Sequence, residues 1–250
     1  MEQKVYFKNL IGNRLVGILS NPTGDKTKPI VVFVHGHSSS KETRNFSLIN
    51  ELLIQKGIST FRFDLSGHGE SEGEFANTTV SIAVNDILYA IKYLDKLGYT
   101  KIGLVGSSFG GIACIGAASK SAKLFVTVLK APVSNYKDLY VWRKEDINKW
   151  KKQGYRDYLS KKGILRLNYD FYEDAINNDG YIAGAKIKVP TLIVHGDCDE
   201  QVPLEQSIKL AKIIPDAKLI IIKGADHTFT DPMLMKQKSK IIVEFIIQNL

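Results

Sequence analysis

The stretch Leu104-Val105-Gly106-Ser107-Ser108-Phe109-Gly110-Gly111 joins an apolar run to the pattern Gly-x-Ser-x-Gly. Residues 101–105 are predicted to form a short buried strand, and the small, apolar residues of 110–120 favour a closely packed helix. Between a strand and a helix, this pattern makes a sharp turn that strains the serine backbone and exposes its hydroxyl. Glycines on both sides lack a Cβ and so avoid a clash. The stretch therefore predicts a nucleophile, Ser108, at the end of a buried strand.

The composition is that of an ordinary globular enzyme. The 250 residues are 44% hydrophobic and 24% charged, which predicts one domain over residues 1–250. No apolar run approaches the ~20 residues that span a membrane, and the N-terminus lacks the layout of a signal peptide. We therefore expect a cytoplasmic protein without membrane insertion. Only two cysteines are present, and no Cys/His cluster has metal spacing, so we expect neither a disulfide framework nor a metal or other cofactor.

The positive charge is concentrated in one segment. The net charge is +8, and residues 137–166 hold ten Lys/Arg against four Asp/Glu, which is six of these eight charges. The rest of the chain is near neutral, which argues against a nucleic-acid binder. The segment is either a solvated helical surface or a basic cover that attracts anionic substrates to an active site.

Strand and helix patterns alternate along most of the chain. Strands are expected at 5–7, 14–19, 30–34, 58–63, 101–105, 124–129, 191–194 and 218–222, and helices at 45–56, 79–97, 110–120, 204–213 and 233–247. This order predicts an α/β fold with a mainly parallel, doubly wound sheet, preceded by an antiparallel pair. Residues 134–185 are aromatic and basic without a convincing strand. We expect them to form a helical cap inserted between two core strands.

Chemically active side chains follow five of the predicted strands. They lie in His35-Gly36-His37-Ser38, in Asp64–Gly69, at Ser108, in His195–Asp199 and in Gly224–His227. Because the carboxyl ends of parallel strands meet at one edge of a sheet, we expect these segments to converge there. A serine, carboxylates and a histidine follow one another in the order Ser…Asp…His.

Essentially the whole chain resembles an α/β-hydrolase. The matching segments are His35-Gly36, Asp64-x-x-Gly67-His68-Gly69-x-Ser71, Gly106-x-Ser108-x-Gly110, His195-Gly196-x-x-Asp199-x-x-Val202-Pro203 and Gly224-Ala225-Asp226-His227. The length and the position of the cap are most similar to small bacterial esterases of the cinnamoyl/feruloyl-esterase type. In those esterases an aromatic residue often follows His-Gly and a glutamine often follows the nucleophile, where this chain has His37 and Phe109.

The resemblance and the chemistry assign three catalytic roles. A serine hydroxyl is a poor nucleophile until a base takes its proton, so Ser108 needs a histidine. His227, in a loop after the last strand, is the candidate. A carboxylate must then fix the tautomer of this histidine. Asp199 has the spacing of the family pattern, and Asp197 is the alternative.

The oxyanion of a tetrahedral intermediate needs two backbone N–H donors. We expect these from His37 and from Phe109, whose N–H begins a helix. The side chain of His37 is a further candidate for substrate contact. Four other polar residues at strand ends are expected to be structural: His35, Asp64, His68 and His195.

The cap is expected to choose the substrate. Its aromatic residues either line an acyl or phenolic pocket or pack against one another. Asp138, Tyr140 and Tyr169 are the candidate substrate contacts. For Asp138, a helix-start aspartate is the alternative.

The resemblance implies a serine hydrolase that cleaves small-molecule carboxylic esters, either hydroxycinnamoyl or short-chain, through an acyl-enzyme. A thioesterase or monoacylglycerol-type lipase would use the same three residues. A serine aminopeptidase would require carboxylates that bind an amine. A ligand-binding module on the same fold is the alternative outside enzymes. The sequence leaves the oligomeric state open, with a homodimer among the states it allows.

Overall fold

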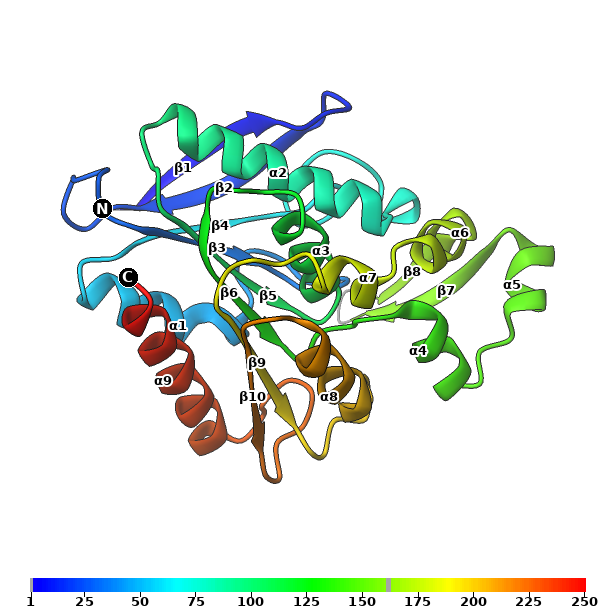
Figure 1. Ribbon diagram of the computed structural model, residues 1–250. Coiled ribbons are helices and arrows are strands. Elements are labelled where there is room, and N and C mark those ends of the chain that lie inside the picture. The colour runs from blue at the N-terminus through cyan, green and yellow to red at the C-terminus, as the bar shows by residue number, and fades with distance from the viewer. Residues whose placement is uncertain (1, 161–162) are drawn as a thin grey trace.

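An eight-stranded sheet forms the centre of the computed structural model, which describes residues 2–160 and 163–250 (Figure 1). Its strands are β1 (Glu2–Lys8), β2 (Arg14–Ser20), β3 (Ile30–Val34), β4 (Ser59–Phe63), β5 (Ile102–Ser107), β6 (Leu124–Lys130), β9 (Thr191–Gly196) and β10 (Ala217–Ile222). They lie in the order β1-β2-β4-β3-β5-β6-β9-β10. β2 pairs antiparallel with β1 and β4, and the other pairs are parallel. The predicted α/β fold with a mainly parallel sheet is therefore confirmed.

Helices cover both faces of the sheet (Figure 1). Two apolar cores result, one with α1 (Arg44–Gln55) and α9 (Pro232–Gln248), the other with α2 (Val80–Lys96), α3 (Phe109–Ala118) and α8 (Leu204–Ile213). In β3, Val31 and Phe33 face one core while the alternate residues face the other. A strand buried on both faces has this continuous apolar character.

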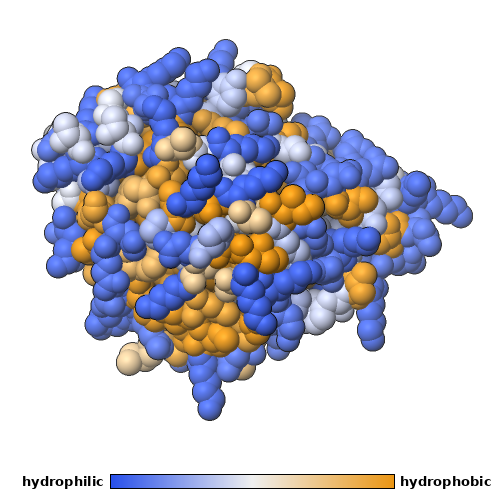
Figure 2. All heavy atoms as spheres, in the orientation of Figure 1, coloured by the Kyte–Doolittle hydropathy of each residue, from blue (hydrophilic) through white to orange (hydrophobic). Residues whose placement is uncertain are grey.

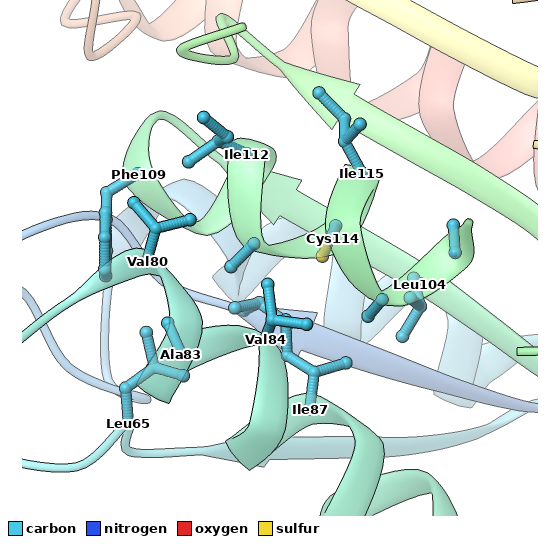
Figure 3. Packing of buried hydrophobic residues seen from close by; sticks show 14 of the residues in the cluster. Leu65, Val80, Ala83, Val84, Ile87, Leu104, Phe109, Ile112, Cys114 and Ile115 are labelled. Atoms are coloured by element: carbon cyan, nitrogen blue, oxygen red, sulfur yellow. The ribbon is translucent and has the colours of Figure 1, made fainter. Parts of the chain in front are cut away.

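Buried apolar side chains pack α2 against α3 (Figure 3). Thr79 precedes α2, and its Oγ1 accepts a hydrogen bond from the N–H of Ile82 at 3.1 Å, which caps the helix. Val84 of α2 faces the small residues of α3, where a Cβ on Gly116 would approach it to 2.7 Å. This close contact explains the small-residue composition of the helix.

The cap, residues 134–185, projects from the sheet between β6 and β9 (Figure 1). Its helices are α4 (Tyr136–Trp142), α5 (Ile147–Gln153), α6 (Asp170–Asn177) and α7 (Gly180–Gly184). It also contains an antiparallel hairpin, β7 (Tyr155–Ser160) and β8 (Gly163–Asn168), which packs near a short 3₁₀ helix, η1 (Phe75–Asn77). The expectation that the cap holds no strand is therefore wrong at this hairpin.

An inward-facing arginine conceals the hairpin in the sequence. Arg156 stacks on the Trp150 ring, with its guanidinium carbon 4.2 Å from the ring centroid. Arg156 alternates along β7 with the exposed residues Asp157 and Leu159. A charged residue at an inner position hides the period-two alternation of apolar residues that predicts a strand.

The surface of the cap is largely hydrophilic on the face shown in Figure 2, with apolar side chains between the charges. Val141 (74% exposed) and Ile164 (70% exposed) are exposed apolar residues of the cap. Within the described residues, no helix has the length and apolar character required to cross a bilayer.

Candidate active site

Ser108 lies on the strained turn between β5 and α3. Its backbone angles are φ 56° and ψ −117°, a region that residues with a side chain rarely occupy. A Cβ on Gly106 would approach the carbonyl oxygen of Gly110 to 2.5 Å and the sulfur of Cys114 to 2.7 Å. A Cβ on Gly110 would collide with the carbonyl of Val34. The two glycines of the motif therefore let the turn pack against α3 and β3.

The loop after β3 passes directly beside Ser108. A Cβ placed on Gly36 would lie 3.4 Å from the Cβ of Ser108 and 4.0 Å from its Oγ. The next residue in this loop is His37. The backbone N–H groups of His37 and Phe109 find no acceptor among the described residues. Two free donors therefore lie near Ser108, one in the next residue and one in the loop after β3.

Two histidines hold this loop in place. Nδ1 of His35 donates to the carbonyl of Gly36 (2.8 Å), and its Nε2 accepts from the N–H of Leu65 (3.1 Å). Nε2 of His68 accepts from the N–H of Ser38 at 3.3 Å. A ring nitrogen that accepts a hydrogen bond is unprotonated, so both rings are neutral. The structural role expected for His35 and His68 agrees with these contacts.

A buried ion pair secures the other end of the same loop. Nζ of Lys41 lies 2.6 Å from Oδ2 of Asp64, and both side chains are almost fully buried. The N–H of Lys41 also donates to Oδ1 of Asp64 at 2.7 Å. Glu70 supplies a second carboxylate to Lys41 at 2.6 Å. Asp64 therefore joins the turn after β4 to the loop beside Ser108.

His227 and Asp199 meet at the carboxyl edge of the sheet. Nδ1 of His227 donates to Oδ2 of Asp199 at 2.7 Å, and both side chains are buried. Oδ1 of Asp199 accepts from the N–H groups of Gln201 (2.8 Å) and Val202 (2.9 Å). Burial raises the pKa of Asp199, but hydrogen bonds from two histidines outweigh it and hold this pKa well below its usual range. Asp199 is therefore ionised and orients His227 with Nε2 free.

The second histidine that binds Asp199 is His195, which we expected to be only a packing residue. Its Nε2 lies 3.1 Å from Oδ2 of Asp199 and 3.1 Å from the carbonyl of Val202. Both partners are acceptors, so Nε2 carries the proton. Nδ1 then accepts from the hydroxyl of Ser207 at 2.6 Å. The spacing His-x-x-x-Asp at a strand end is the sequence signal for this contact.

Asp197, the alternative carboxylate, has a different partner. It is exposed, and its Oδ1 accepts from the N–H of Gly224 at 2.6 Å. This bond closes the loop in which His227 lies. Asp197 therefore has a loop-closing contact, whereas Asp199 contacts the imidazole.

A buried lysine, which the sequence did not point to, contacts the same loop. Lys130 ends β6, is 1% exposed, and donates from Nζ to the carbonyl of His227. Its Nζ lies 5.6 Å from the ring centroid of Phe229, and Nζ of Lys238 lies 5.3 Å from the same centroid. Burial lowers the pKa of Lys130 to about 8, against the opposing effect of nearby Asp199. Lys130 thus links the end of β6 to the backbone that carries the imidazole.

The electrostatics of this edge favour a neutral imidazole at His227. Burial and the positive charge of Lys130 lower its pKa to about 4, although Asp199 acts in the opposite direction. A neutral imidazole with Nδ1 bound to a carboxylate presents Nε2 as a base. The arrangement can therefore accept a proton from a nearby hydroxyl.

A cavity of about 550 Å³ opens beside Ser108 and His227. Its wall comes from the loop after β3 and the start of α1, from the end of β7, and from the loop after β10. Tyr158 and Leu159 supply its apolar side chains, whereas most of the remaining wall carries hydroxyl or amide groups. Ser108 and His227 therefore face one space, whose wall carries many hydroxyl groups.

The three predicted substrate contacts lie away from this cavity. Asp138 is exposed and 3.7 Å from Nζ of Lys209. Tyr140 is 3% exposed and packs edge-on against Trp150, with ring centroids 6.0 Å apart. Tyr169 packs edge-on against the same Trp150 at 5.9 Å. The cap aromatics are thus packed against one another, and the hairpin contributes the cap residues that line the cavity.

The described basic residues of the cap also lie outside the cavity wall. Among the basic residues of 137–166 that the structure describes, none lines the cavity. Lys161 and Lys162 lie outside the described residues. Arg143 instead donates to the carbonyl of Gln201 at 2.6 Å. The contacts favour the solvated-surface interpretation of this segment.

Known proteins resemble this chain in both sequence and structure. The model of the prolyl oligopeptidase family matches residues 44–250. The mitochondrial palmitoyl-protein thioesterase ABHD10 of Mus musculus is 28% identical over 221 residues, covering 85% of this chain and 71% of that protein. Est1E of Butyrivibrio proteoclasticus with bound ferulic acid is 25% identical with a TM-score of 0.86, over 98% of both chains. Mouse alpha/beta hydrolase domain-containing protein 10 is 23% identical with a TM-score of 0.83, over 98% of this chain and 99% of that one.

Proposed function

Because the chain belongs to the prolyl oligopeptidase family of α/β-hydrolases, we propose that it is a serine hydrolase that cleaves carboxylic esters through an acyl-enzyme. The observation that carries the proposal is the combination of a strained Ser108 and an Asp199-bound His227 in one cavity. A serine, a histidine and a carboxylate in these relations activate a hydroxyl for acyl transfer.

The reaction has two steps, acylation of Ser108 and hydrolysis of the acyl-enzyme. Oγ of Ser108 attacks the ester carbonyl while Nε2 of His227 takes its proton, and the N–H groups of His37 and Phe109 bind the oxyanion. His227 then protonates the leaving oxygen, and the alcohol departs. Water, deprotonated by His227, attacks the acyl-enzyme and releases the acid. Asp199 stays ionised throughout and stabilises the imidazolium.

Thioester cleavage is the second candidate, since the mouse relative is named a palmitoyl-protein thioesterase. The same residues would perform it. The space open to the acyl chain separates the two candidates. A long acyl chain would lie on the side of Phe109 and Phe171, whose rings are fully buried and packed, so it would gain little new burial, which favours esters of short acids.

A series of p-nitrophenyl esters from acetate to decanoate, with methyl ferulate and palmitoyl-CoA, tests this proposal. An apolar pocket would raise kcat/KM about fourfold for each added methylene, since each contributes ~0.8 kcal/mol when buried. We expect instead a maximum at acetate to butyrate and a decline toward decanoate. A steady rise to decanoate, with rapid cleavage of palmitoyl-CoA, would favour the thioesterase.

The pH profile of kcat/KM should show an acid limb well below that of an ordinary histidine. The base must be neutral to accept a proton, and the pKa of His227 is lowered to about 4. Protonation therefore removes activity only as pH falls through that value, rather than through the usual ~6.5. We expect nearly full kcat/KM at pH 5.5. A limb centred above pH 6 would contradict this environment of His227.

Replacing Lys130 with Met should lower kcat about 10- to 100-fold with little change in KM, because small displacements of a catalytic group have effects of this size. The substitution removes the donor to the carbonyl of His227. It also removes a positive charge, so the acid limb of kcat/KM should move to higher pH.

Lys238→Met is the matched control for this variant. Lys238 is equally buried and lies near the same Phe229 ring, but it donates to the carbonyl of Asn45 at 2.8 Å. We expect a smaller loss of kcat than for Lys130→Met. If both variants lose kcat equally and the acid limb of kcat/KM does not shift, Lys130 contributes to the stability of the fold and not to the position of His227.

The cytoplasmic location remains part of this proposal, and the mouse relative is named as mitochondrial. The single-domain organisation over residues 1–250 and the homodimer likewise remain predictions. Size-exclusion chromatography with light scattering measures the oligomeric state directly.

A further inference from the structure

We propose that the cavity beside Ser108 receives the leaving group and that the alcohol it fits is neutral and polyhydroxylated, such as a polyol. The inference rests on the proposed function and extends it from the reaction to the substrate class. Three observations carry it: the component of the ester that faces the cavity, the free hydroxyls in the cavity wall, and the charges of the cavity wall.

The position of His227 indicates that the leaving group faces this cavity. The imidazole must protonate the leaving oxygen, so the departing alcohol lies within hydrogen-bond reach of its Nε2. His227, Thr228 and Thr230 form one part of the wall, and Ser38–Ser40 and the start of α1 form another. Phe109 and Phe171, on the side of the aromatic cluster, are fully buried and do not line it. The space beside Ser108 is therefore on the alcohol side.

Several hydroxyls in the wall have no hydrogen-bond partner among the described residues, and three of them lie in the loops on either side of the entrance to Ser108. These three belong to Ser38 and Ser39, after β3, and to Thr228, after β10. Other hydroxyls of the wall are engaged: Oγ1 of Thr43 caps α1, and Oγ1 of Thr230 donates to Asp226. A polyol that enters the cavity can pair with the three free groups, whereas an alkyl alcohol would displace water from them without replacing its hydrogen bonds.

The charges of the wall match a neutral occupant. Arg44 and Glu42 are its cation and its carboxylate, and Glu42 also lies 3.5 Å from Arg62. His227 adds no positive charge near neutral pH, since burial and Lys130 lower its pKa to about 4. An anionic leaving group would therefore find no net positive charge among the described residues of the wall.

Two acetate esters that differ only in the hydroxyls of the alcohol test the proposal. 1-Monoacetylglycerol and n-propyl acetate share the acyl group and a three-carbon alcohol, and p-nitrophenyl acetate reports on the reaction itself. We expect kcat/KM for monoacetylglycerol to exceed that for n-propyl acetate about tenfold or more, because a site that binds a hydroxyl discriminates against an analogue that lacks it.

Variants locate this preference in the cavity. Thr228→Val and Ser39→Ala each remove one hydroxyl and should each lower the ratio of the two kcat/KM values about 2- to 10-fold, the range expected for one hydrogen bond. Thr100→Val is the matched control, because Thr100 is exposed and precedes β5 at the opposite end of the strand from Ser108. In Thr100→Val, the ratio of kcat/KM for monoacetylglycerol to that for n-propyl acetate should equal the wild-type ratio.

The outcomes separate this inference from the proposed function. A ratio at or below one in a wild type that cleaves p-nitrophenyl acetate overturns the inference alone. So does a high ratio that neither Thr228→Val nor Ser39→Ala reduces. A wild type that cleaves none of the three esters overturns both. A high ratio that falls in the two cavity variants and not in Thr100→Val supports the assignment.

Discussion

Ser108→Ala is expected to lower kcat for p-nitrophenyl acetate about 10⁴- to 10⁶-fold, the size of effect seen when the nucleophile of such a triad is removed. The residue occupies the strained turn at φ 56° and lines the cavity that also holds His227. Alanine retains the Cβ and requires the same backbone angles, so the fold should remain and circular dichroism should match the wild type. Turnover measured at high enzyme concentration gives the residual rate.

Ser119→Ala provides the control for this variant. Ser119 lies at the other end of α3, where its Oγ donates to the carbonyl of Gly116 at 2.8 Å. Its activity should stay within a few fold of the wild type. A Ser108→Ala protein that retains a tenth of the wild-type kcat would exclude Ser108 as the nucleophile.

Asp199→Asn is expected to lower kcat about 10⁴-fold, the effect of presenting an amide to the histidine of such a triad. Oδ2 of Asp199 accepts two hydrogen bonds, from Nδ1–H of His227 and from Nε2–H of His195. Oδ1 already accepts the N–H groups of Gln201 and Val202. An amide NH₂ in place of Oδ2 would face two donors, which forces the His227 tautomer to change or the ring to move.

Asp197→Asn is the matched substitution two residues away. Asp197 accepts from the N–H of Gly224 and does not contact the imidazole. Its amide oxygen can still accept that bond, so kcat should fall less than tenfold. A larger loss in Asp197→Asn than in Asp199→Asn would reverse the assignment of the carboxylate.

Local patterns in the sequence were sufficient for the sheet and for the positions of Ser108, Asp199 and His227. A continuous apolar run such as β3 is buried on both faces. Its assignment as a strand therefore does not depend on knowing which residues face the core. The motif around Ser108 requires a strand, a turn and a helix, and each of these has its own local signal. The order of such segments along the chain then placed their carboxyl ends on one edge.

The features that escaped prediction depend on contacts that form only when loops and segments fold back on one another. Lys130 ends an apolar strand, and its contact with the carbonyl of His227 joins residues 97 apart in sequence. The bond from His195 to Asp199 depends on how the loop after β9 folds back. In the cap, inward-facing Arg156 conceals a strand, and the aromatic residues pack with one another, so Tyr140 and Tyr169 lie away from the cavity.

Labelling with a fluorophosphonate tests the central claim most directly, since such reagents trap a serine whose hydroxyl is activated by a base. Intact-mass analysis of the wild type should show one adduct per chain, and peptide mapping should place it on Ser108. Ser108→Ala should not be labelled, and His227→Ala should react far more slowly. An unlabelled but folded wild type, or an adduct on a residue other than Ser108, would contradict the account.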